Sequence, residues 1–390
     1  MPEPIMHSKV FQCSKAHRWL NCFLSAKFND QSGTIDNPRT LFGTESHSIG
    51  AALILESLNL KDYEETKSFS ELIKEATMYD DEMKEVTEGY ASFVVGIYEA
   101  EKRRIGHDPF ITVEQHLDLD IDEDAGGTMD CGIIADDTLI VIDLKTGFTP
   151  VSSGTTENCP FNEQLGLYGY GFYQTYKDIY SEIKKVRLVI YQPTCKNTNE
   201  FETTIDELIK FRNELIMPAV KKINELSDEA NPGDYCRYCP INARCSKRAE
   251  ILKVVESKKD KTLLSNEEIE TILPKLDEII DYVTDLKDYC LKKAISGHKW
   301  SGYKLVVSKV SRKISDEKAV IKICEQEGVD PYANKKLAGI TELTKRLGKD
   351  KFKEKINPYI TIQEGSYVLV PNSDSREEIN VNKEEKNNEV

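Results

Sequence analysis

The feature that most constrains the fold is the run "TLIVIDLKTG", residues 138–147, in which four consecutive apolar residues are followed by an acid and then a lysine. An apolar run of this length, bounded by turn residues, predicts a buried strand. Side chains alternate between faces along a strand, so Asp143 and Lys145 would emerge on the same side. The sequence therefore places a carboxylate and an ammonium side by side at the end of an apolar strand.

The neighbouring segments predict an α/β domain in which helices and strands alternate. "GGTMDCGIIADDTLIVIDLKTG" is typical of a hairpin that turns at "ADD". "LFGTESHSIGAALILESLNL" predicts a helix for which Thr44 is a plausible N-cap. Further helices are predicted at 11–28, 68–104 (one or two), 161–178 and 204–226, and further strands at 111–121 and 185–193.

The sequence changes character after "NPGDYCRYCPINARC". Beyond it the pattern predicts helices, a short strand pair around "GYKLVVSKVSRKI", and a final strand at "GSYVLVP". We predict a main domain over residues 1–250 and a smaller C-terminal α+β domain over 251–373. The polar, aromatic-free tail at 374–390 is predicted to be disordered.

Composition narrows the class of protein. The formal net charge of −15 excludes a protein that coats nucleic acid, although it permits an enzyme that holds nucleic acid in one local channel. No apolar run approaches the roughly 20 residues that cross a bilayer. Ten cysteines without a recognisable export signal lead us to expect reduced thiols and a cytoplasmic location.

The acids near the apolar strand suggest metal chemistry. Hard divalent cations such as Mg²⁺ or Mn²⁺ prefer oxygen ligands, and one carboxylate rarely suffices. Asp130, in "GTMD", lies on the preceding strand and would approach Asp143 if the two strands pair; Glu114 is a candidate for an extra acid. An ammonium at position 145 beside a metal-bound water suits the hydrolysis of phosphodiesters.

Three cysteines close together, Cys236, Cys239 and Cys245, have the spacing C-x₂-C-x₅-C. Such spacing suggests a soft metal or cluster, and a fourth ligand must come from elsewhere in the chain. The second C-x-x-C pair of a zinc ribbon is missing from the sequence. We interpret five others as ordinary packing or surface residues: Cys131, Cys159, Cys195, Cys290 and Cys324.

The order of these motifs resembles the RecB-type branch of the PD-(D/E)xK nuclease superfamily. His47 in "GTESHSIG" matches that family's Gly-x-x-x-His, and Gln164 and Tyr168 match its Gln-x-x-x-Tyr. The resemblance implies a restriction-endonuclease-like core with a mixed central sheet flanked by helices. It implies that Lys145 is catalytic, that Gln164 and Tyr168 position the lysine or the phosphate, and that the metal ligands are His47, Asp130, Asp143 and the carbonyl of Leu144.

Members of the same branch carry a 4Fe–4S cluster, with one cysteine near the N-terminus of the nuclease domain and three after it. By resemblance, the first is Cys22, with Cys13 as a competitor in the same segment, and the others are Cys236, Cys239 and Cys245. Four thiolates suit such a cluster, which would staple the two ends of the domain. A zinc ion held by the same cysteines is the alternative.

Nearly the whole chain, to about residue 376, resembles a phage and prophage family catalogued as domain of unknown function 2800. That resemblance implies a DNA nuclease, an exonuclease in our interpretation, that acts in phage recombination or replication in the bacterial cytoplasm. A phage single-strand annealing protein is the partner implied. The alternative function is a non-catalytic DNA-binding or scaffold subunit of a recombination complex with the same fold.

Aromatic and basic residues are interleaved in "HKWSGYKLVVSKVSRK" of the C-terminal domain. This pattern is compatible with DNA contact through stacking and phosphate binding. It is equally compatible with a small packed domain that has a solvated basic face.

Overall fold

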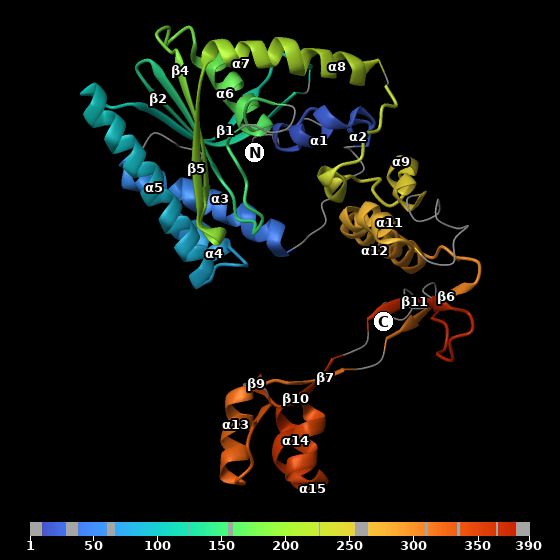
Figure 1. Ribbon diagram of the computed structural model, residues 1–390. Helices are drawn as coiled ribbons and strands as arrows, with labels where there is room; N and C mark the ends of the chain where they lie inside the picture. Colours follow the sequence, from blue (N-terminus) through green and yellow to red (C-terminus); the bar gives the residue numbers. More distant parts are fainter. Residues whose placement is uncertain are drawn as a thin grey trace, which may run out of the picture. The chain divides into compact units, whose positions relative to one another are not determined.

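Figure 1 shows the chain as a computed structural model, which describes residues 10–28, 38–60, 67–123, 125–154, 159–225, 227–253, 264–308, 311–333, 336–363 and 366–379. Two compact units divide the chain, Met1–Lys259 and Asp260–Val390. The finer division expected at residues 250 and 373 stays a prediction, and most of the expected disordered tail lies outside the described residues.

A mixed five-stranded sheet forms the centre of the first unit, in the order β1-β2-β3-β4-β5. The pairs β1–β2, β2–β3 and β4–β5 are antiparallel, whereas β3–β4 is parallel. This arrangement confirms the predicted α/β class. The strands are β1 (Phe110–Asp118), β2 (Gly126–Ala135), β3 (Thr138–Leu144), β4 (Lys185–Gln192) and β5 (Asn197–Thr204).

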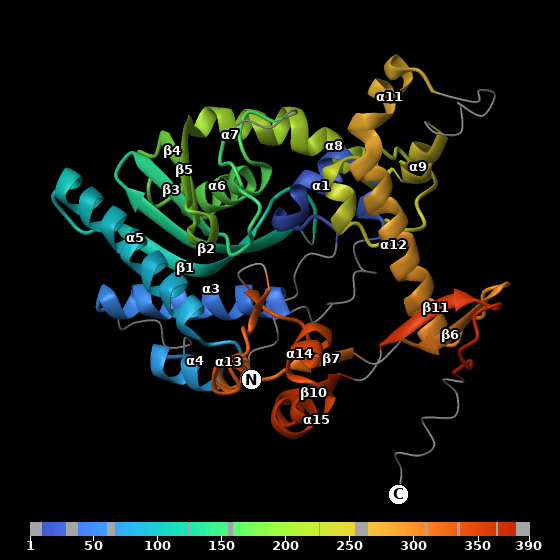
Figure 2. The same cartoon turned by 60° about the horizontal axis from the view of Figure 1, so that its bottom comes forward.

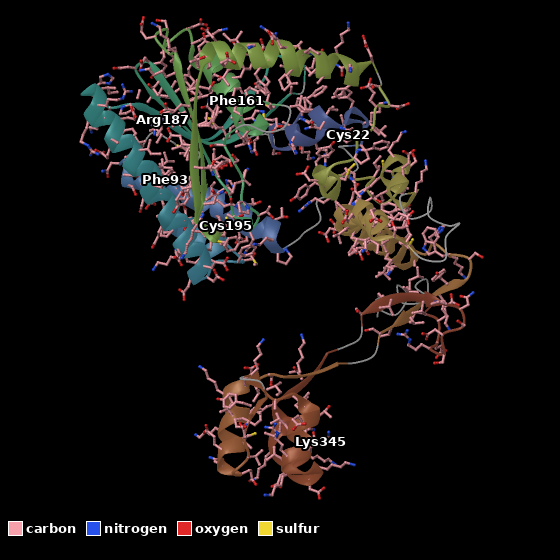
Figure 3. All side chains as sticks on the ribbon, in the orientation of Figure 1. Cys22, Phe93, Phe161, Arg187, Cys195 and Lys345 are labelled. Carbon is pink, nitrogen blue, oxygen red and sulfur yellow. The ribbon has the colours of Figure 1, made fainter. Side chains whose placement is uncertain are left out.

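Strand β3 is buried along its whole length because helices cover both faces of the sheet. Leu139 and Val141 point into one hydrophobic core, and Ile140 and Ile142 point into the other. The first core is formed with α6 (Glu163–Tyr176), α7 (Ile205–Phe211) and α8 (Met217–Asn224), and the second with α3 (Pro38–Ser57), α4 (Phe69–Glu75) and α5 (Asp81–Ile105). Figure 2 shows these two helical layers on opposite sides of the sheet, and in Figure 3 the labels Phe161 and Phe93 mark one layer each.

Two helices begin or break where the sequence did not predict it. Helix α3 starts at Pro38, so Thr44 lies inside the helix, where its hydroxyl donates to the carbonyl of Thr40. Proline suits the first helical turn because its missing N–H has no partner there in any case. The segment predicted as one helix at 11–28 is a 3₁₀ turn (Cys13–Lys15) followed by α1 (Ala16–Asn21) and α2 (Phe23–Ala26), separated by Cys22 in an extended conformation.

Strand β5 was not predicted, because its sequence "NTNEFETT" is polar. Its residues alternate between half-buried and exposed, as expected for an edge strand with one covered face. The long helix expected at 204–226 contains a π-helical turn, Arg212–Ile216, just before Pro218. Proline cannot donate the usual hydrogen bond, so the ladder changes there.

The second unit consists of helices and short two-stranded sheets, as predicted. The expected pairing of its first two strands is wrong: β6 (Tyr303–Val307) pairs with β11 (Tyr367–Pro371), and β7 (Ser311–Ile314) pairs with β10 (Ile360–Gln363). The other elements are α11 (Asn266–Ile272), α12 (Leu276–Ile295), α13 (Glu317–Gln326), β8 (Tyr332–Ala333), β9 (Lys336–Leu337), α14 (Ile340–Leu347) and α15 (Lys349–Lys351). A short helix of the first unit, α9, covers Ser246–Ala249.

None of the helices in the described ranges has the length and apolarity to cross a bilayer.

A substitution at Gly132, on β2, probes how tightly α6 packs on the sheet. A Cβ built on it would lie 2.4 Å from Met129 Cε and 2.7 Å from the ring of Phe172, so Gly132→Ala should lower the free energy of unfolding by about 1–3 kcal/mol. The matched control is Gly96→Ala in α5, where a Cβ meets nothing within 4 Å. That change should stabilise by roughly 0.5–1 kcal/mol, because alanine favours helices.

Both variants are measured by urea unfolding in a Trp300→Phe background. The chain has two tryptophans, so the fluorescence then reports on Trp19, which is fully buried in the first unit. An unchanged midpoint for Gly132→Ala would contradict the packing described here.

Candidate functional site

The site lies where strands β2 and β3 stop pairing. Their last hydrogen-bonded pair is Cys131 with Ile142, so Asp130 and Asp143 stand one residue beyond it, opposite each other. The backbone N–H of Leu144 donates to Asp130 Oδ2 at 2.7 Å and holds that carboxylate across the opening. Both carboxylates are buried. The carbonyl of Leu144 as a metal ligand stays a prediction.

The ladder between β1 and β2 is also interrupted at this level. Val113 pairs with Cys131 and Gln115 pairs with Met129, whereas Glu114, opposite Asp130, makes no ladder pair and has a positive φ of 48°. A non-glycine residue in this region of φ/ψ space costs on the order of 1–3 kcal/mol, and such residues cluster at functional sites. The strained backbone directs a third acid toward the opening between β2 and β3.

Helix α3 brings a histidine to the same place. His47 Nδ1 lies 3.1 Å from Asp130 Oδ1 and 3.9 Å from Glu114 Oε1. One ligand atom from each of His47, Glu114 and Asp130 lies within 4.8 Å of the other two. Two carboxylates and an imidazole at this separation could hold a divalent cation such as Mg²⁺ or Mn²⁺.

Asp143, on the neighbouring strand, is already paired. Lys145 Nζ lies 2.8 Å from its buried Oδ2, and the amide of Gln164 donates to its Oδ1 at 3.1 Å. The ammonium compensates part of the buried charge, so Asp143 as a metal ligand stays a prediction. The donor set of His47, Glu114 and Asp130 fits a hard divalent cation.

Gln164 connects the predicted lysine to the predicted tyrosine. Its side-chain carbonyl accepts a hydrogen bond from Lys145 Nζ at 2.9 Å, and its amide nitrogen donates to Asp143 Oδ1 at 3.1 Å and to the hydroxyl of Tyr168 at 3.3 Å. The structure thus brings these four side chains together from β3, its following residue and α6. Their catalytic roles remain predictions.

Gln164 lies in the first turn of α6, and the N-cap residue of this helix, Asn162, was not predicted from the sequence. The side chain of Asn162 accepts from the backbone N–H of Gln164 at 3.1 Å and of Leu165 at 3.2 Å. The signal was available, because asparagine is a favoured N-cap. Glu163, buried in the same turn, lies 3.1 Å from His17 Nδ1, whose Nε2 is 3.3 Å from Asp234.

Burial and the repulsion between neighbouring carboxylates raise the pKa values of two acids in the site. Burial and the charge of Asp130 raise the pKa of Glu114 to about 7, and burial raises the pKa of Asp143 to about 6. Burial lowers the pKa of His47, but the charge of Asp130 and its hydrogen bond outweigh this and raise the pKa to about 9. The pKa of Lys145 is raised despite burial, because Asp143 and Asp130 stabilise its charge.

The four cysteines assigned by resemblance line one pocket. Cys22 comes from the break between α1 and α2, and Cys236, Cys239 and Cys245 come from the segment after α8. In the described ranges no three thiol sulfurs come within 4.8 Å of one another, so the residues are gathered without forming a compact ligand shell. Cys13, the competitor of Cys22, packs instead in the hydrophobic core beside Gly127.

The pKa shifts at His47 and Glu114 predict that cation affinity at this candidate site depends on pH. A cation must displace the proton of His47, and that of Glu114 where it is protonated, because metal ligands bind in their deprotonated forms. With pKa values raised to about 9 and about 7, protons are released on binding, so Mn²⁺ affinity should rise as pH increases through 7 toward 9. Titration calorimetry at several pH values, in buffers of different ionisation enthalpy, measures both affinity and proton release.

His47→Gln is the control for the metal titration, since it should weaken binding and remove the part of the pH dependence due to the imidazole. An affinity that is constant with pH, or binding without proton release, would contradict this site.

Comparisons with solved structures give three likenesses of low identity. The crystal structure of SSO0001 is 13% identical, with 63% of this chain and 89% of that chain covered and a TM-score of 0.29. A crystal structure described as "Putative exonuclease" from Eubacterium rectale is 10% identical, with 63% of this chain and 93% of that chain covered and a TM-score of 0.37. The alkaline exonuclease LHK-Exo of Laribacter hongkongensis is 14% identical, with coverages of 48% and 95% and a TM-score of 0.20.

At these identities and TM-scores, the three likenesses carry no argument about what the chain does. The family comparison is far more extensive, because one family model matches residues 7–377. The chain therefore belongs to the family described as "Protein of unknown function (DUF2800)".

Proposed function

We propose that this protein is a divalent-metal-dependent nuclease that hydrolyses the phosphodiester bonds of DNA, with exonuclease action as the specific form. One observation carries the proposal: Asp143, which stands opposite Asp130 at the end of the β2–β3 pairing, also contacts Lys145 and Gln164. Cation ligands and a positively charged side chain therefore adjoin, and both are needed where a phosphate is attacked.

Each residue has a task in this proposal. His47, Glu114, Asp130 and Asp143 would hold Mg²⁺ or Mn²⁺, with the Leu144 carbonyl as a further ligand. A cation bound there would supply Lewis-acid chemistry at the phosphate. Lys145, whose pKa is raised, stays charged at neutral pH and stabilises the negative charge that develops on the phosphate oxygens.

Gln164 and Tyr168 keep the lysine in place. Without the hydrogen bond from Nζ to Gln164, the flexible lysine stem would sample other rotamers at the cost of the productive geometry. Tyr168 is almost completely buried and hydrogen-bonds to Gln164, so it supports the amide from behind. These are positioning roles.

The biological setting that we propose is phage DNA recombination in the bacterial cytoplasm, beside a single-strand annealing protein. The rival function is a non-catalytic DNA-binding or scaffold subunit. The ion pair of Lys145 with Asp143 favours the enzyme, since a scaffold has no need of a lysine and an acid held together over a strained acid cluster.

Lys145→Ala and Asp143→Ala should each reduce cleavage of linear DNA in Mg²⁺ or Mn²⁺ by at least about 10²–10³-fold, because each removes a group that acts on the developing charge or its cation. The measurement is digestion of end-labelled linear and circular DNA. Lys185→Ala is the matched control: this lysine pairs with Asp137 at the opposite end of the same sheet, and its loss should leave cleavage unchanged.

Circular dichroism and the melting temperature establish that all three variants fold. Wild-type activity in both Asp143→Ala and Lys145→Ala would overturn the proposed mechanism. Metal-independent binding of DNA without any cleavage by the wild type would favour the scaffold.

We also propose that Cys22, Cys236, Cys239 and Cys245 hold a 4Fe–4S cluster, with zinc as the alternative. Their common pocket supports this. Burial raises the pKa of Cys236 and Cys239, and the charges of Arg248 and Arg18 offset part of that rise. Thiolates are the ligand form. The bound group would tie residue 22 to the segment at 236–245.

Protein purified without oxygen should be brown and absorb at about 400 nm, as iron–sulfur centres with cysteine ligands do. Cys236→Ser should lose the colour and iron. Cys195→Ser, a half-buried cysteine outside the pocket, should keep both. Colourless protein with one equivalent of zinc would identify the alternative, and protein with neither metal would refute the proposed staple.

A further inference from the structure

Phe148 is a large aromatic side chain on the loop after β3. It is 66% exposed and belongs to neither hydrophobic core of the first unit. It lies three positions after Lys145 in the chain, which limits the distance between their Cα atoms to about 11 Å. A single exposed apolar residue is ordinary on a protein surface, so what matters here is how the segment around the ring is held and what lies beside it.

The loop that carries Phe148 is held firmly by one buried amide. The side-chain amide of Gln192, which has no exposed surface, donates to the carbonyls of Gly147 at 2.8 Å and Thr149 at 2.9 Å, one on each side of Phe148. Its oxygen accepts from the N–H of Val151 at 3.0 Å. Three hydrogen bonds from the end of β4 therefore hold the backbone on both sides of Phe148.

Helix α3 supports the ring from the other direction. The guanidinium of Arg39 stacks on Phe148 with its Cζ 4.1 Å from the ring centroid, and it also lies 3.3 Å from Glu82. One turn along α3, a Cβ built on Gly43 would lie 3.2 Å from Thr146 Oγ1, so the helix and the loop are in close approach. The aromatic ring and a cation are thus displayed together beside the proposed active site.

We propose that Phe148 is a stacking platform for a base of the DNA strand, with Arg39 beside it to attract the phosphate backbone. This deepens the proposed nuclease function and depends on it for the identity of the substrate. Aromatic side chains stack on any unpaired base, which gives binding without sequence preference. At about 3.4 Å per nucleotide, the reach from Lys145 places the stacked base within roughly three nucleotides of the cleaved bond.

The test uses the full-length protein in a Lys145→Ala background, so that DNA is bound without being cut. The probe is a single-stranded oligonucleotide with 2-aminopurine placed in turn at each of its first and last positions. Stacking on Phe148 should quench the fluorescence at one group of neighbouring positions. Phe148→Ala should abolish this quenching and weaken binding about tenfold or more, and Phe148→Trp should preserve both.

Ile179→Ala is the matched control, because Ile179 is an equally exposed apolar side chain, 72% accessible, on the loop after α6. It should leave quenching and affinity unchanged. With Lys145 restored, Phe148→Ala should raise KM for linear DNA and change kcat little, because it removes binding rather than a group at the reacting phosphate.

The outcomes separate the two proposals. Quenching that needs Phe148, in a protein whose wild type cuts no DNA, supports the platform and refutes the nuclease. Cleaving wild type with unchanged affinity and quenching in Phe148→Ala refutes the platform alone. Failure of the Phe148-containing protein to bind single-stranded DNA also refutes the platform.

Discussion

The separation of β2 and β3 after the Cys131–Ile142 pair determines everything else in the proposed site. Two strands that continued to pair would bury Asp130 and Asp143 against each other without room for a ligand. Instead, the N–H of Leu144 donates to one oxygen of Asp130, and the other oxygen lies 3.1 Å from His47 Nδ1, beside Glu114. Burial raises the pKa of Glu114 and of Asp143, and the charge of Asp130 adds to the rise. A bound cation is the natural compensation for this charge.

The positive φ of Glu114 coincides with a change in the faces to which the side chains of β1 point. Along β1, Val113 points into the core under α3 and α5, whereas Leu117 points into the core under α6, although both are at odd positions. The face alternation is therefore reset between them, at the level of Glu114. The strain is offset by the paired segments on either side, Phe110–Val113 and Gln115–Asp118, which hold the backbone on both sides of it. The backbone at Glu114 thus makes no ladder pair, and its carboxylate lies near Asp130 and His47.

The sequence predicted those parts of the fold that depend on apolar periodicity. The strands of the central hairpin and β4 were predicted because they are largely apolar on both faces, and α6 was predicted because it has an apolar stripe. The order of the motifs indicated which polar residues would meet at one end of the sheet. Strand β5 was missed because its pairing with β4 depends on backbone hydrogen bonds, which its polar side chains do not reveal. The strain at Glu114 and the hydrogen bonds from Gln192 to the Phe148 loop depend on tertiary structure. No local sequence pattern around Glu114 or Gln192 indicates which residues they contact.

The proposal that His47, Glu114, Asp130 and Asp143 converge on one cation is the centre of this account. Its most direct test is a crystal of the full-length protein soaked with Mn²⁺ and measured near the manganese absorption edge. We expect an anomalous peak between these four side chains, within about 2.0–2.4 Å of their ligand atoms. No peak at this position in crystals that bind Mn²⁺ elsewhere, or a peak without contact to Asp143, would contradict it.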